Sequence, residues 1–279
     1  MARRTTARPA PRLRTTGGGD AQGTVQALNR GLALLSSLAQ EPGGVLLTDL
    51  AKRVGLAAST THRLLSTLER AGFAELDDAT GLWRVGVRTV SVGSAFLRGR
   101  DFVSLARPFM RQLTDFSGET SNMAIRREDA AVYISQVESA AMVRAFSKLG
   151  DRVPLTCSGV GLALLTVSSE EEISALLHRT GLPSFTPKSI DTPAKLRDTL
   201  ILGRSRGYVV DDEAHALGMR CVAAPFFDVH GEIVAAISIS GPTARLTENR
   251  ALELGGAVAR TAREITQRIG GNPPAEFAS

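Results

Sequence analysis

One stretch of the sequence, residues 57–71, constrains the fold more than any other. If it forms a helix, at about 100° per residue, its side chains separate into two faces. One face carries Ala57, Thr61, Leu64, Leu68 and Ala71, with Leu65 at its margin, and the other carries Ser59, His62, Arg63, Ser66 and Arg70. The first face is suited to packing, and the second presents hydroxyl groups and hydrogen-bond donors. The pattern predicts a helix that is anchored by one side and can bind with the other.

The segments on either side of this stretch predict a small helical domain that ends in a hairpin. Apolar residues at helical spacing precede it, namely Val25, Leu28, Leu32, Leu35 and Leu38. A short second helix is expected over 48–54, with Thr48 as its N-cap, and two short strands are expected at 73–76 and 82–85. The order helix, helix, turn, helix, hairpin over 22–86 is typical of a winged helix-turn-helix.

The polar face of the third helix is suited to the major groove of DNA. Small side chains let a helix approach the groove, serine and threonine reach phosphates or base edges, and arginine can bind guanine through two hydrogen bonds. The candidate DNA contacts are Ser59, Thr60, His62, Arg63, Ser66 and Arg70 in the helix and Arg84 in the hairpin. The alternative is the solvated face of an ordinary helix, which the neighbouring helix and hairpin disfavour.

The distribution of charge also indicates a polyanionic partner for the front of the chain. Residues 1–100 contain 14 Lys and Arg against 7 Asp and Glu, whereas residues 101–279 contain 19 against 21. Residues 1–21 hold five arginines, two prolines and three consecutive glycines, with almost nothing to bury, and we expect a disordered basic tail. On its own this asymmetry is a weak signal.

The rear of the chain mixes strands and helices. We expect a linker helix over 87–100, an effector-type domain over 101–270 and a short tail over 271–279. Within the domain, helices are expected over 102–116 and 159–167, after a capping box at Ser169–Glu172, after Thr192-Pro193 and from Thr247, and strands at 122–125, 131–137, 143–146, 208–210, 221–227 and 233–240. Because the two types do not strictly alternate, the prediction is an α+β fold with an antiparallel-rich sheet.

Several classes of protein are disfavoured by composition. The two cysteines, Cys157 and Cys221, provide no disulfide framework and no cluster with metal-ligand spacing. We therefore expect no metal and no cofactor. No apolar run approaches the roughly 20 residues that span a bilayer, and the basic start lacks the apolar core of a signal peptide. We expect a cytoplasmic protein with no membrane partner.

Small polar residues on the rear strands predict a cavity. Ser238 and Ser240 are two residues apart on one strand, so both hydroxyl groups point to the same face, and Cys221 lies on the preceding strand. Asp211 ends another strand, and the segment 156–161 precedes an apolar helix with backbone N–H groups that would suit a carboxylate. We expect a small polar cavity for a short oxo-acid, although these residues could also simply fill a tight sheet. His215 is expected in a surface loop.

Taken together, these motifs resemble the IclR type of bacterial transcription regulator over about residues 22–269. The resemblance rests on the sequences at 27–35, 59–65 and 68–73 in the front domain, and on those at 181–183, 186–187, 207–213, 218–225 and 237–242 in the rear. It implies a GAF-like (profilin-like) effector domain, dimers that pair into tetramers, and near-palindromic double-stranded operators. Two positions depart from the family pattern: Ala57-Ala58 replaces Pro-Lys, and Leu162 replaces a lysine.

The run from Asp211 to Cys221 is similar to the members of the family that respond to glyoxylate, pyruvate or allantoin. This resemblance implies that the effector pocket is lined by Gly159, Val160, Asp211, Cys221, Ser238 and Ser240. It implies a repressor whose operator binding is modulated by a small carboxylate. The second interpretation is a regulator of aromatic-acid catabolism, for which activation is open as the output.

Two further alternatives remain at this stage. Cys221 as the nucleophile of an enzyme would need a base within hydrogen-bond reach, and no nucleophile motif surrounds it, so we expect no enzyme. The rear domain could instead serve oligomerisation alone. Our hypothesis for the mechanism is that two chains pair through the front domains and residues 87–100, and that effector binding changes the spacing of the two recognition helices.

Overall fold

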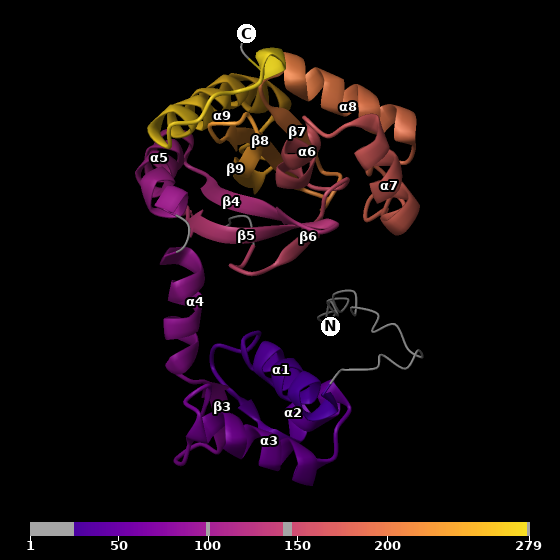
Figure 1. Cartoon of the computed structure of the whole chain (residues 1–279). Helices are drawn as coiled ribbons and strands as arrows, with labels where there is room; N and C mark the ends of the chain where they lie inside the picture. Colours follow the sequence, from indigo (N-terminus) through magenta and orange to yellow (C-terminus); the bar gives the residue numbers. More distant parts are fainter. Residues whose placement is uncertain (1–24, 99–100, 142–146, 278–279) are drawn as a thin grey trace, which may run out of the picture. The chain divides into compact units, whose positions relative to one another are not determined.

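The computed structural model describes residues 25–98, 101–141 and 147–277 (Figure 1). The chain divides between Phe96 and Leu97 into two compact units, and the division falls inside helix α4 (Arg88–Arg98), where the sequence predicts a linker helix. The expected basic tail and the expected strand at 143–146 lie outside the described residues.

The front unit has the element order that the sequence predicts for a winged helix-turn-helix. Its helices are α1 (Gln26–Leu38), α2 (Leu47–Val54) and α3 (Ala58–Arg70), and its strands are β1 (Val45–Leu46), β2 (Ala74–Asp77) and β3 (Leu82–Val85). The strands pair antiparallel in the order β1-β3-β2. Gly55 ends α2 in the left-handed conformation, which costs glycine little, and the Asp77 carboxylate accepts N–H bonds from Ala79 and Thr80 to close the hairpin turn.

The core of the front unit fixes α3 through one side. Leu34, Leu38, Leu50, Leu65 and Trp83 are buried together. Leu65, expected at the margin of the apolar face, is therefore at its centre. Thr61 is fully buried as well, and its hydroxyl donates to the carbonyl of Ala57, which is how a polar side chain is accommodated there.

The helix expected from the spacing of Val25, Leu28, Leu32, Leu35 and Leu38 is present as α1, but the chain leaves much of this row uncovered. Val25, Leu28 and Leu32 are 64%, 60% and 51% exposed. The core is contacted by Leu38, at the end of the row, and by Leu34 beside it. The positions of α2 and α3 decide which side chains of α1 the chain itself covers.

The rear unit is a six-stranded antiparallel sheet between two layers of helices (Figure 1). The strands are β4 (Thr120–Arg127), β5 (Ala130–Val137), β6 (Arg152–Pro154), β7 (Val209–Asp212), β8 (Met219–Phe227) and β9 (Ile233–Pro242), in the order β6-β5-β4-β9-β8-β7. The helices are α5 (Asp101–Ser117), α6 (Gly159–Leu165), α7 (Glu170–Thr180), α8 (Pro193–Arg206) and α9 (Glu248–Arg268), with a short 3-10 turn at Ala275–Phe277. This confirms the α+β prediction.

The two faces of this sheet pack against different helices. α5 and α9 cover the face that carries Met123, Val222 and Ile237, while α6, α7 and α8 cover the face that carries Ala124 and Ala223. Local signals set two helix starts as predicted: the reciprocal capping box of Ser169 and Glu172 opens α7, and the Thr192 side chain caps α8. The expected Thr48 cap is wrong, because α2 begins at Leu47, with Leu46 as its N-cap and no side-chain cap. None of the helices in the described part of the chain is both long and apolar enough to cross a membrane.

Candidate DNA-recognition surface and effector pocket

The outward side of α3 carries the residues that the sequence selects for DNA. Ser59, His62, Arg63 and Arg70 are exposed, and Thr60 and Ser66 are half-buried. On the opposite side, Thr61 and Leu65 are completely buried. The helix is thus held rigidly by one side and presents the other, as a recognition helix requires.

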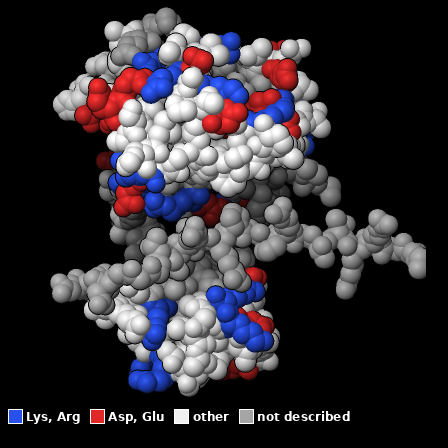
Figure 2. All heavy atoms as spheres, turned by 90° about the vertical axis from the view of Figure 1, so that its right-hand side faces the viewer, with Lys and Arg blue, Asp and Glu red and all other residues white. Residues whose placement is uncertain are grey.

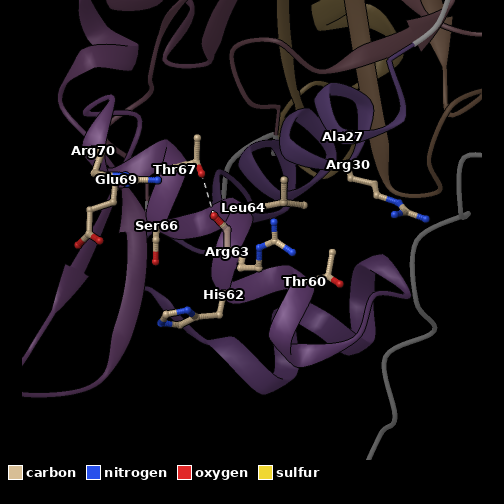
Figure 3. Close-up of a pocket in the computed structure, with 10 residues that line it drawn as sticks. All are labelled: Ala27, Arg30, Thr60, His62, Arg63, Leu64, Ser66, Thr67, Glu69 and Arg70. Carbon is tan, nitrogen blue, oxygen red and sulfur yellow. Dashed lines mark hydrogen bonds between the residues drawn. The ribbon is translucent and has the colours of Figure 1, made fainter.

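A hollow of about 700 Å³ lies between α3 and α1 (Figure 3). It is lined by Ala27 and Arg30 from α1 and by Thr60, His62, Arg63, Leu64, Ser66, Thr67, Glu69 and Arg70 from α3. The hydroxyl of Thr67 donates to the carbonyl of Arg63 at 2.9 Å, which keeps Thr67 turned back onto its own helix. Five of the predicted DNA contacts therefore surround one concave surface, and Ser59 lies outside it.

Arg30 is the residue of this surface that sequence reasoning missed. It was read only as part of a packing helix, yet it lines the same hollow as Arg63 and Arg70. Within the described part of the chain, none of these three guanidinium groups forms an ion pair. Unpaired cations around a concavity are suited to phosphate oxygens. The available signal was Arg30 itself, a cation in an otherwise uncharged helix.

Arg84 is placed differently. It lies on β3 and not in the hollow, and its guanidinium is 3.3 Å from a carboxylate oxygen of Asp77. In the view of Figure 2, blue cationic patches on the front unit are separate rather than continuous, while cations and anions are intermingled over the rear unit. The geometry therefore places Arg84 on the hairpin beside Asp77, apart from the candidate residues of α3.

The second candidate site is a cavity of about 260 Å³ in the rear unit. It lies on the sheet face next to α6 and is lined by Tyr133, Ser147, Ser158, Gly159, Asp211, His215, Ala216, Met219, Arg220, Cys221 and Ser240. Asp211 pairs across the strands with Cys221, and Cys221 pairs with Ser240, so these three side chains form a row on one face. Four of the six predicted pocket residues therefore line one cavity. Val160 and Ser238 are fully buried next to it.

The acidic and thiol groups of the cavity are both shifted towards their neutral forms. Burial raises the pKa of Asp211 to about 6, although hydrogen bonds from the backbone of Ala214, His215 and Gly159 act in the opposite direction. Burial, together with the nearby Asp211 charge, raises the pKa of the Cys221 thiol to about 12. The thiol therefore stays protonated at neutral pH, which is unsuitable for a catalytic nucleophile.

The expectation of free backbone N–H groups at the start of α6 is wrong. The N–H of Gly159 bonds to Asp211, the N–H of Val160 bonds to Cys221, and the N–H of Gly161 donates to the hydroxyl of Ser158 at 3.2 Å. The closeness of this packing explains the glycine: a Cβ atom at residue 159 would lie 2.6 Å from the Cys221 sulfur. These amides therefore form hydrogen bonds within the cavity wall and are not free to bind a ligand.

His215 is also misplaced by the sequence-based interpretation. It is not on the surface but half-buried at the rim of the cavity, where its ring packs edge-on against Phe185 with a centroid separation of 5.3 Å. Tyr133 and Ser147 line the same rim and carry no signal in the sequence that would have selected them. In the described residues, no group of three or more His, Cys, Asp or Glu side chains is arranged to hold a metal ion.

Comparisons with known proteins find a match for each of the two units. The family description "IclR helix-turn-helix domain" matches residues 27–78, and "Bacterial transcriptional regulator IclR C-terminal" matches residues 94–267. The chain is 44% identical over 251 residues to the acetate operon repressor of Salmonella typhimurium, covering 89% of this chain and 92% of that protein. It is 45% identical over 251 residues to the transcriptional repressor AllR of Escherichia coli, with 90% and 92% covered.

Solved structures show the same architecture. The crystal structure of the Thermotoga maritima IclR protein superimposes with a TM-score of 0.75 at 28% identity, over 87% of this chain and 98% of that one. A Rhodococcus regulator superimposes with a TM-score of 0.77 at 26% identity, over 88% and 99%. With a winged helix-turn-helix in front and this effector-type domain behind, the chain belongs to the IclR family of bacterial transcriptional regulators.

Proposed function

We propose that this regulator is a repressor that reads its operator with α3 and responds to a small carboxylate in the rear cavity. The observation that carries the proposal is the division of α3 between a buried side, with Thr61 and Leu65, and an exposed side that carries Arg63. A helix with that division, followed by a hairpin, is suited to insertion in the major groove.

On the DNA, the residues of the α1–α3 hollow divide into two roles. Arg63 projects from the exposed side of α3, where a bidentate contact to guanine would read sequence. Arg30 comes from α1 and contacts the phosphate backbone, which positions the helix without reading a base. Ser59, His62 and Arg70 add contacts along the same side of α3.

For the effector, the size and chemistry of the cavity support a compact oxo-acid of the glyoxylate type or a related ureide. About 260 Å³ is small for an aromatic acid with substituents, and the lining is rich in hydroxyl groups. Because Asp211 has its pKa raised to about 6, it can take up a proton and so tolerate an anionic ligand beside it. The acetate operon repressor and the repressor AllR, to which the chain is similar, support repression as the output.

The uncovered stripe of α1 supports assembly with a second copy of the chain. Val25, Leu28 and Leu32 form an exposed apolar row, and Val87 and Val90 are exposed at and beyond the end of the hairpin. Exposed rows of this kind mark interaction surfaces. A homodimer, or a dimer of dimers, formed through them would present two copies of α3 in the cytoplasm to a near-palindromic operator.

The test is a footprint on duplexes selected from a random library, with and without glyoxylate. We expect protection of two symmetric half-sites about one helical turn apart, and weaker protection when glyoxylate is added. The double variant Ser238→Ala/Ser240→Ala should bind the same duplexes and ignore glyoxylate. Protection without any sequence preference, or an unaltered glyoxylate response in the double variant, would contradict the proposal.

A further inference from the structure

Among the described residues that line the rear cavity, Asp211 provides the one carboxyl group. It is only 6% exposed, and across the strands it is paired with Cys221. Its Oδ1 atom accepts the N–H of Ala214 at 2.8 Å, and the N–H groups of His215 and Gly159 also bond to the carboxyl group. These neutral amides hold the group in place, but they bring no positive charge to balance it.

The cations nearest to this carboxyl group are already paired. Arg220 is the one cationic side chain among the described lining residues. Its Nε atom donates to Asp212 at 2.8 Å, its Nη2 atom donates to the same carboxylate, and its Nη1 atom donates to the carbonyl of Leu246. Lys188, in the loop that precedes α8, is held by Asp212 and Glu213. Neither cation is therefore available to an anion that enters the cavity.

The other titratable groups around Asp211 carry no positive charge near neutral pH. They are Tyr133 on β5, Cys221 on β8, Cys157 before α6 and His215 in the loop after β7. Burial raises the pKa of the tyrosine and of both thiols, and it lowers the pKa of the histidine, so all four are neutral at pH 7. A ligand carboxylate in the cavity therefore meets a second negative charge without a counter-ion in the described residues.

Two carboxylates placed together in a buried site do not both remain charged, because their repulsion raises the pKa of the more basic one. Asp211 is the more basic of the two. Burial has already raised its pKa to about 6, and an oxo-acid carboxylate is a weaker base than that. Once protonated, Asp211 becomes an O–H donor, so a hydrogen bond to the ligand replaces the repulsion.

We propose that this regulator binds its effector together with one proton, which Asp211 receives, so that its response depends on pH as well as on effector concentration. The O–H bond of Asp211 is the one covalent bond that forms, and solvent supplies the proton. The inference rests on the proposed function, because it adds regulation to the same cavity. Above the pKa of the free protein, effector affinity should fall about tenfold for each pH unit, and below it the affinity should level off.

Titration calorimetry of the full-length protein with glyoxylate counts the proton. At each pH, the heat of binding is measured in buffers that differ in ionisation enthalpy, and the slope of one against the other gives the number of protons taken up. From a pKa of about 6 in the free protein, we expect about one proton per ligand at pH 7.5 and about a quarter of a proton at pH 5.5. Glyoxylamide has the same size but no charge, so it should bind without proton uptake.

Variants then assign the proton to its residue. Asp211→Asn removes the proton acceptor but keeps an amide oxygen for the backbone N–H groups, so it should bind glyoxylate without proton uptake and with the same Kd at pH 5.5 and 7.5. His215→Gln removes the other group that could accept a proton, and it should retain the uptake. Asp198 is exposed on α8 and outside this cavity, so Asp198→Asn is the matched control and should behave like the wild type. Thermal unfolding shows whether each variant is folded.

Each contrary result has a separate meaning. Glyoxylate binding without proton uptake in the wild type, or uptake that survives Asp211→Asn, would overturn this inference and leave the proposed function intact. Uptake that is lost in His215→Gln would assign the proton to the histidine. Loss of all glyoxylate binding in a folded Asp211→Asn protein would show that the charge is required, which also contradicts the inference. If neither ligand binds at either pH, the proposed effector class fails together with it.

Discussion

The two candidate sites of this chain differ in how their polar groups are prepared for a partner. The outward side of α3 is open, and Arg30 and Arg63 form no ion pairs within the described residues. The rear cavity lies on the sheet face next to α6, and several of its polar groups are paired with one another, as Asp211 is with three backbone N–H groups. Cations without an ionic partner attract a polyanion, and salt weakens that attraction, whereas buried and paired groups select a ligand by the hydrogen bonds that it must match.

This comparison is tested most strongly by Asp211, whose folded-state pKa of about 6 lies above the ordinary 3.8. The native state therefore holds its proton more tightly than the unfolded state, so stability falls as the pH rises from about 4 to about 6 and the deficit persists above that range. Asp211→Asn removes the buried charge. Relative to the wild type, we expect its free energy of unfolding to be higher at pH 8 than at pH 4 by up to about 3 kcal/mol. Denaturant unfolding at several pH values measures this.

The adjacent Asp212 is the control for that experiment. Burial raises its pKa, but hydrogen bonds from Lys188 and Arg220 outweigh burial and hold the pKa of Asp212 below its ordinary value. A lowered pKa contributes stability above the unfolded-state value and loses it as the pH falls. Asp212→Asn should therefore destabilise the protein at pH 8, the opposite sign to Asp211→Asn. The same pH trend in both variants would contradict the distinction between enclosed and open carboxylates.

Gly159 tests how closely the cavity wall is packed. In Gly159→Ala the new methyl group would meet the Cys221 sulfur at 2.6 Å, and overpacking of this kind costs about 1–3 kcal/mol. We expect a lower melting temperature and loss of the effector response, with operator binding retained. Cys221→Ala removes the sulfur, so the double variant Gly159→Ala/Cys221→Ala should recover part of the stability that Gly159→Ala loses. In Gly256→Ala, inside α9, the new methyl group meets only the tip of Arg260, at 3.7 Å, and that variant should be at least as stable as the wild type.

Arg63 tests base reading at the open site. Because the side chain forms no ion pair with any residue that the structure describes, Arg63→Ala should leave stability unchanged while weakening binding to a selected operator about tenfold or more. The preference of the variant protein among operator sequences should become weaker at one base pair. Competition gel shifts with single-base substitutions measure both effects. An unchanged base preference would remove Arg63 from the reading residues.

Arg30 should have the smallest effect and a different signature. As a phosphate contact, its loss in Arg30→Ala weakens binding to all duplexes by a similar factor and lowers the slope of log K against log salt by about 1. Lys52, which is exposed and lies 3.7 Å from Asp49, gives the matched removal of a cation outside the hollow. Equal salt slopes for Arg30→Ala and Lys52→Ala would contradict the special position of Arg30.

Sequence reasoning succeeded where the determinants are local. The caps at Ser169 and Thr192 depend on residues within one helical turn, and they occur where they were predicted. In the middle of α3 the two sides were separated correctly, because the helical period fixes them, whereas Ala57 and Ala71, expected on the packing side at its two ends, are exposed. The alternation that put Ser238 and Ser240 on one face follows from strand geometry, although only the register showed that Ser240 lies directly opposite Cys221.

Sequence reasoning failed where the position of a side chain depends on packing by segments that are distant in the chain. Two stripes of α1 have helical spacing, and their sequence does not show that Leu34 faces the chain's own core while Leu28 remains uncovered. The position of His215 depends on how the loop after β7 folds back towards Phe185, a contact between residues 30 positions apart in the chain. The amides of α6 were expected to be free because their partners, Asp211 and Cys221, come from distant strands.

Asp211 accepts hydrogen bonds from three backbone N–H groups, and this has a consequence for how the ligand specificity of such sensors can change. One carboxyl group joins the end of a strand, the loop that follows it and the first turn of a helix, so replacing it to suit a new ligand would loosen all three at once. New specificities are reached more cheaply at His215, a half-buried side chain of the cavity lining that packs against Phe185. For anyone building a biosensor on this scaffold, the loop that carries His215 is the place to randomise.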